Sequence, residues 1–159
     1  MKIRWGRVIF VVATGVAVGA AVMLWQRGQP RRNALQEVSK LAVNLENNRG
    51  AELLNNILIP LAVQSRTQSE QAEFIVKALA DEISPAGVES LKRQAEFGPL
   101  KSIFPKEAPD WCLQAGVDVN ECVAFKMERV GIRAEVVMLR EGQTYRIVRC
   151  NNVKQMAGT

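Results

Sequence analysis

The feature that most constrains this chain is an uncharged stretch near its start, residues 8–25. An α-helix rises ~1.5 Å per residue, so this stretch covers about 27 Å, close to the ~30 Å hydrocarbon core of a bilayer. Trp5 and Trp25 bracket it, and indole rings favour the two membrane interfaces. The pattern predicts a basic flank over residues 1–7, a transmembrane helix over 8–25 and a juxtamembrane linker over 26–33.

Basic side chains flank both ends of the predicted membrane helix, and their nearly equal numbers slightly favour an N-terminus inside the cell. The cell membrane is therefore the expected location, as a single-pass protein with its domain on the extracytoplasmic (periplasmic) side. The stretch is longer than the apolar region of a signal peptide, although cleavage after Ala20 is the alternative. The residues expected at the membrane interfaces are Trp5, Arg7, Trp25, Arg27, Arg31 and Arg32.

Small residues recur inside the same stretch at the spacing of one helix face. Gly15 and Gly19 form a G-x-x-x-G pattern. Small residues let two membrane helices approach closely, although they are also common in membrane helices generally. The residues expected to pack against a helix of another membrane protein subunit are Ala13, Gly15, Ala17, Gly19 and Ala21.

The net charge of +5 comes from the predicted membrane flanks. Six of the 21 Lys and Arg residues lie at or before Arg32, where no acidic residue occurs, so the rest of the chain holds 15 basic and 16 acidic groups. A nucleic-acid-binding domain normally has a basic surface of its own. The sequence therefore argues against a nucleic-acid partner.

The chain contains no histidine and three cysteines. Histidine is the usual general base and the commonest metal ligand, and three cysteines without histidine make a poor zinc set. No phosphate-binding or nucleophile motif occurs either. We therefore expect no catalytic residue, no metal and no cofactor, although an enzyme working through Glu, Lys or Tyr is a third interpretation.

Residues 34–116 carry helical patterns. Apolar residues at spacings of three and four predict an amphipathic helix whose stripe consists of Leu35, Val38, Leu41, Ala42 and Leu45. Helix boundaries are marked by Asn33 as N-cap, by a capping box of Thr67 and Glu70, by Ser84 before Pro85, and by Gly116 as a C-terminal stop.

Residues 121–153 alternate between apolar and polar in three segments separated by Val130-Gly131 and Glu141-Gly142. Short alternating runs between turns predict an antiparallel meander of three or more strands. One side of the last strand is expected to carry Tyr145, Ile147 and Arg149. Helices followed by strands define an α+β domain over residues 34–159, in which several helices pack on the apolar face of the meander.

Two other features concern candidate sites. Cys112 and Cys122 bracket a turn, and they either form a disulfide in an oxidising compartment or remain reduced as small buried hydrophobic residues. The meander is rich in arginine and glutamate, which indicates either a solvated face with cross-strand ion pairs or a face that docks an acidic partner. The residues of that predicted partner face are Arg133, Arg140, Tyr145 and Arg146.

The order of helices and then a meander, behind one membrane anchor, resembles the nuclear-transport-factor-like (cystatin-like cone) superfamily. The resemblance covers residues 33–153 and rests on element order rather than on a diagnostic motif. It departs in strand number, because those cones usually have four or more strands and the sequence shows three. It implies a scaffold or a small-ligand pocket, and members with one anchor occur in bacterial secretion and assembly machines.

Together these observations predict a non-enzymatic accessory or assembly subunit of a membrane protein complex, with a domain for protein–protein contact. The alternative is a membrane-tethered cone that binds a small ligand or lipid. The sequence does not indicate an oligomeric state.

Overall fold

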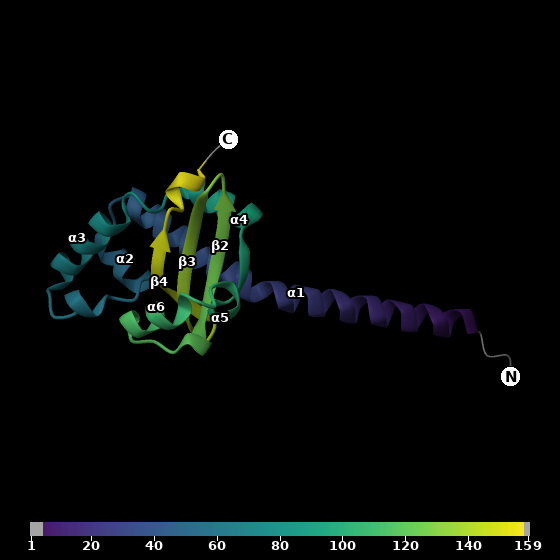
Figure 1. Cartoon of the computed structure of the whole chain (residues 1–159). Helices are drawn as coiled ribbons and strands as arrows, with labels where there is room; N and C mark the ends of the chain where they lie inside the picture. Colours follow the sequence, from purple (N-terminus) through teal and green to yellow (C-terminus); the bar gives the residue numbers. More distant parts are fainter. Residues whose placement is uncertain (1–4, 158–159) are drawn as a thin grey trace. The chain divides into compact units, whose positions relative to one another are not determined.

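The computed structural model describes the backbone of residues 5–157 and the side chains of residues 18–157. Over these residues the chain forms six α-helices and one four-stranded antiparallel sheet, so the predicted α+β class is confirmed (Figure 1). It divides into two compact units, Met1–Arg32 and Asn33–Thr159.

The described residues of the first unit, from Trp5 onward, belong to α1 (Trp5–Glu46). The residues predicted as a linker, 26–33, are also helical, with Pro30 inside the helix. Gly28 and Pro30 suggested a break there, but their Gln and Arg neighbours are good helix formers. Within the described residues, no helix is long and apolar enough to cross a membrane.

The expected membrane and packing residues fall partly outside what the structure describes. Trp5, Arg7, Ala13, Gly15 and Ala17 precede residue 18, so their side chains lie outside the described residues. The expected residues that follow residue 17 are all exposed or half-buried, and these are Gly19, Ala21, Trp25, Arg27, Arg31 and Arg32. Arg32 donates a hydrogen bond of 2.9 Å to the Trp25 carbonyl, and its guanidinium lies 5.8 Å from the centre of the indole ring.

The second unit begins with the rest of α1. The other helices are α2 (Gly50–Asn56), η1 (Leu61–Val63), α3 (Gln68–Leu79), α4 (Pro85–Gln94), α5 (Leu100–Ile103), α6 (Ala108–Ala115), η2 (Val119–Glu121) and η3 (Lys154–Met156). The predicted capping box of Thr67 and Glu70 is present, Ser84 caps α4, and Gly116 ends α6 in the left-handed conformation. Asn33 is no N-cap, because α1 passes through it.

The sheet has the order β1-β2-β3-β4 and contains β1 (Glu96–Pro99), β2 (Cys122–Arg129), β3 (Ile132–Glu141) and β4 (Thr144–Asn151). Strand β1 was not among the predicted strands, because it is short and contains Gly98 and Pro99. It pairs antiparallel with β2 and makes the sheet four-stranded. Ile57 forms a single parallel bridge to Ile147, and Leu58 N–H donates to the Ile147 carbonyl at 2.8 Å, so this segment covers part of the free edge of β4.

A bulge in β4 changes which of its residues share a side. Val137 pairs with Arg149 and Met138 pairs with Ile147, which leaves Val148 as the extra residue. Tyr145, Ile147 and Cys150 are therefore all in the main core cluster, whereas Arg149 lies on the opposite side. The predicted alternation was wrong beyond Ile147, because a bulge shifts the period of two by one residue.

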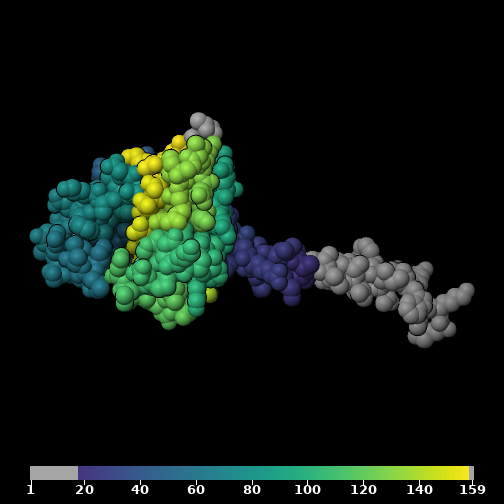
Figure 2. Space-filling model, in the orientation of Figure 1, coloured from purple at the N-terminus to yellow at the C-terminus, as the bar shows by residue number. Residues whose placement is uncertain are grey.

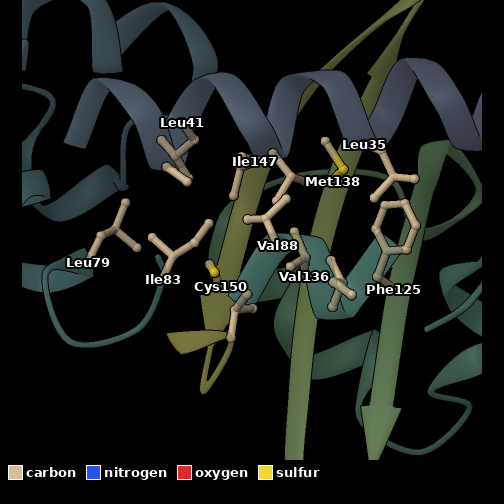
Figure 3. Packing of buried hydrophobic residues seen from close by; sticks show 14 of the residues in the cluster. Leu35, Leu41, Leu79, Ile83, Val88, Phe125, Val136, Met138, Ile147 and Cys150 are labelled. Atoms are coloured by element: carbon tan, nitrogen blue, oxygen red, sulfur yellow. The ribbon is translucent and has the colours of Figure 1, made fainter. Parts of the chain in front are cut away.

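Both faces of the sheet are covered. On one face, α1, α3 and α4 pack through a large cluster (Figure 3) that includes Leu35, Val38, Leu41, Leu79, Val88, Phe125, Val136, Met138 and Ile147. On the other face, α5 and α6 pack through a smaller cluster of Leu100, Phe104, Ala108, Cys112, Cys122, Ala124, Val137 and Leu139. The sequence predicted one apolar face. The second face is visible in the unbroken apolar run over 136–139, which is typical of a strand buried on both sides.

One close backbone approach joins α4 to the segment after β4. A Cβ atom added at Gly87 would lie 2.0 Å from the Val153 carbonyl oxygen. Glu82 also holds this segment, because its carboxylate accepts from Asn152 N–H at 2.7 Å and its carbonyl accepts from Lys154 N–H at 2.8 Å. Position 87 therefore requires a residue without a side chain.

Candidate functional site

A groove of about 230 Å³ opens in the second unit beside the bulge of β4. Its walls come from the segment that follows the Ile57 bridge to β4, from α6, and from β4 itself. The lining residues are Leu58, Ile59, Pro60, Trp111, Gln114, Ala115, Val148 and Arg149. Figure 2 shows the face of the molecule where the teal residues around 60, the green α6 and the yellow β4 meet.

An apolar side chain continues onto the rim of this groove. Leu61 at the start of η1 is 59% exposed. Leu61 lies against the end of α6, since its Cδ1 atom would be 3.8 Å from a Cβ added at Gly116. An exposed apolar residue beside an apolar groove marks an interaction site more often than an isolated one does. We refer to the groove with Leu61 as the α6 groove.

The polar side of the α6 groove is formed by Arg149, which two neighbours hold in place. Its Nε atom donates to Glu135 Oε1 at 2.8 Å, and its guanidinium lies 4.9 Å from the centre of the Trp111 ring. The Arg149 side chain is nevertheless 42% exposed. A guanidinium fixed on one side and open to solvent on the other is oriented to donate hydrogen bonds to a bound molecule.

Glu135 is the centre of a charge network beneath the α6 groove. It is 2% exposed and pairs with Arg149 and with Arg133, whose Nε lies 3.3 Å from Glu135 Oε2. Arg133 also donates to Glu107 at 3.0 Å and lies 5.3 Å from the centre of the Phe104 ring. A hydrogen bond from the residue's own backbone, and then Arg133, lower the pKa of the Glu107 carboxyl. Two arginines and two glutamates balance, so the network offers orientation rather than net charge.

Cys112 and Cys122 lie beside this network. Both are buried, Cys112 on α6 and Cys122 at the start of β2, and their Sγ atoms are 4.0 Å apart. Burial raises the pKa of both thiols, that of Cys122 to about 12. Cys150 lies in the core on the other face of the sheet, where burial raises its pKa to about 12. The structure therefore brings the two predicted partners together and separates the third cysteine from them.

The residues of the predicted partner face do not come together. Tyr145 is buried in the main core cluster, where burial raises the pKa of its hydroxyl. Arg140 pairs with Tyr145 in the register, and Arg146 pairs with Glu141 beside the β3–β4 turn. Arg133 lies seven positions before Arg140 along β3, which is about 23 Å at the rise of a strand. Only Arg133 contributes to the site described above.

Sequence reasoning missed the α6 groove, because its walls come from three distant segments. Ile59, Trp111 and Arg149 are brought together only by the sheet bulge and by the packing of α6. Trp111, on a short helix that already buries Ala108 and Cys112, was the one available signal. In the described part of the chain, no three His, Cys, Asp or Glu residues are placed to hold a metal ion.

Comparisons with protein-family models, with curated proteins and with solved structures each found no match.

Proposed function

We propose that this chain is a single-pass membrane protein whose second unit binds a protein partner through the α6 groove, as a non-enzymatic accessory or assembly subunit of a membrane complex. The observation that carries the proposal is the α6 groove itself, with its apolar wall, the exposed Leu61 at its rim and its fixed arginine. The expected side of the membrane is the extracytoplasmic one.

Support for the anchor comes from the sequence of residues 8–25, which is uncharged, bracketed by two tryptophans and flanked by arginines on both sides. The small residues Gly15 and Gly19 support packing against a helix of the same complex. The tethered unit then needs only modest affinity, because a shared membrane raises the effective concentration of its partner.

The size and charge of the α6 groove support a protein partner. Sites for whole small molecules usually measure ~300–1,000 Å³, and this groove is smaller and lies open at the surface. It suits one or two apolar side chains of a partner, with Trp111 as the aromatic anchor. Because the network around Glu135 is balanced, Arg149 favours a neutral acceptor such as a backbone carbonyl over a phosphate.

The proposal is tested by placing a photo-reactive amino acid at Gln114, which lines the α6 groove and is exposed, in the full chain and in the cells from which the chain comes. Val130 is the control, since it is also exposed but lies in the β2–β3 turn. After irradiation, membranes are washed with alkaline carbonate. We expect a cross-linked product from Gln114 at least about tenfold above that from Val130, retained in the washed membranes.

Two variants sharpen this experiment. Leu61→Asp places a charge at the rim of the α6 groove and should reduce the Gln114 product, whereas Val130→Asp should leave it unchanged. Equal products from both positions would contradict the role of the α6 groove. A chain released by carbonate would contradict the anchor.

The second candidate is a cone that binds a small apolar ligand. Strand β1 favours it, because it brings the sheet to the four strands that such cones usually have. Native mass spectrometry of the full chain in detergent separates the two functions. A bound small molecule that is lost in Leu61→Asp would support the cone.

A further inference from the structure

We propose that Cys112 and Cys122 form an intramolecular disulfide that fastens α6 to the sheet. This covalent site goes beyond the proposed function and does not depend on it. Its effect on the α6 groove, described below, does rest on the proposed function.

The geometry favours this pair and no other. The two Sγ atoms are 4.0 Å apart, which is contact distance, and the residues are ten positions apart in the chain. The pair sits within the smaller core cluster, whereas Cys150 belongs to the cluster on the opposite face of the sheet. Gly116, in the left-handed conformation, reverses the chain between the two cysteines and brings them together.

The bond forms by thiol–disulfide exchange with a disulfide-containing oxidant. One cysteine, as thiolate, attacks the oxidant and forms a mixed disulfide, and the second cysteine then displaces the oxidant's remaining sulfur. Each cysteine loses one proton, and the pair loses two electrons. The oxidant takes up both electrons and leaves as two thiols, so the exchange balances.

Burial determines when this happens. Both thiols are almost completely covered, and Cys122 Sγ also lies 3.4 Å from the Asp118 carbonyl oxygen. A buried thiol rarely ionises and is hard to reach, so an oxidant meets the pair before α6 docks. The disulfide therefore forms during folding, and afterwards the fold shields it from reductants.

The disulfide would also hold the wall of the α6 groove. Cys112 directly follows Trp111, whose ring contacts Arg149, and α6 has only eight residues. A helix of that length is not stable by itself and depends on packing. If the α6 groove binds a partner, the oxidised chain presents Trp111, Gln114 and Ala115 in a fixed arrangement, and the reduced chain does so less strongly.

The test is to refold the full chain in detergent with a mixture of reduced and oxidised glutathione, and then to alkylate it under denaturing conditions. We expect one alkylated cysteine, Cys150, before reduction and all three after it. Trypsin releases residues 107–126 as one peptide that contains both Cys112 and Cys122, and this peptide should be lighter by two hydrogens. Three alkylated cysteines before reduction, or a bond to Cys150, would overturn the proposal.

Thermal melting tests whether the disulfide stabilises the folded chain. Closing so short a loop should raise the melting temperature of the oxidised chain by about 10 °C over the reduced chain. Cys150→Ser should keep this difference and Cys112→Ser should lose it. An oxidised chain that melts no higher than the reduced one would contradict the role as a fastener. Neither readout needs a partner, so failure here is distinct from failure of the proposed function.

Discussion

At the scale of single residues, Val130 has the most unusual combination of residue type and backbone conformation. It is a β-branched residue with φ of 49° in a two-residue turn, next to Gly131 at 77°, and its side chain is 94% exposed. Both positions of such a hairpin turn need positive φ, which Asn and Gly adopt readily and Val does not. Local strain is thus present at a position where the side chain gains nothing from packing.

We predict that Val130→Asn raises the free energy of unfolding by about 1 kcal/mol, because it relieves the strain without removing a contact. Urea denaturation measures the change. Val130→Thr is the matched control, since it keeps the branched shape and should leave the stability unchanged. Equal stabilisation by both substitutions would show that the gain comes from removing an exposed apolar side chain and not from relieving backbone strain.

Other residue-level features could be read from the sequence. Thr67, Ser84 and Gly116 perform the capping roles predicted for them, because caps depend on residues within four positions. The end of α1 was not predicted in detail. Asn48 adopts a positive φ there, and Arg49 N–H donates to the Asn44 carbonyl at 2.8 Å, so a left-handed asparagine closes the helix.

At the scale of elements, the helix stripes and the three long strands were predicted, because periodicity is a local property. The stripe of α1 from Leu35 to Leu45 is buried as expected. Strand β1 and the bulge at Val148 were not predicted, because they depend on pairing with β2 and β3. The same dependence hid the α6 groove, whose existence requires the bulge to turn Arg149 toward Trp111.

The approach of α4 to the segment after β4 gives an element-level prediction. Gly87→Ala should lower the free energy of unfolding by about 1–3 kcal/mol, because the new Cβ would overlap the Val153 carbonyl and backbone must move. Gly98→Ala is the control, since its Cβ would meet Ile103 at an ordinary 3.4 Å. Thermal melting of both variants checks this, and a Gly87→Ala loss no larger than that of Gly98→Ala would contradict the close approach.

At the scale of the whole molecule, the reduced chain should lose stability in alkaline solution. Burial raises the pKa of the Cys150 thiol to about 12, compared with an ordinary value of 9.0. Between those values the unfolded chain releases the proton first and binds fewer protons than the folded chain. The free energy of unfolding therefore falls as pH rises above about 9.

We predict that Cys150→Ala loses less stability than the parent chain between pH 8 and about 10.5, by an amount corresponding to at most about one proton. Urea unfolding of both reduced chains at several pH values measures the difference. Cys122 is present in both, so its own titration cancels. Parallel pH profiles would show that the Cys150 thiol titrates alike in the folded and unfolded chain.

The edges of the sheet have a consequence for how copies of this chain behave when crowded. Free strand edges are the places where sheets of separate molecules join and grow into aggregates. Here one edge is the short β1, which contains Pro99, and the other is partly occupied by Ile57 and Leu58. One edge is therefore short and the other is interrupted near its middle, so the fold itself limits the growth of β-aggregates when many copies are concentrated in a small space.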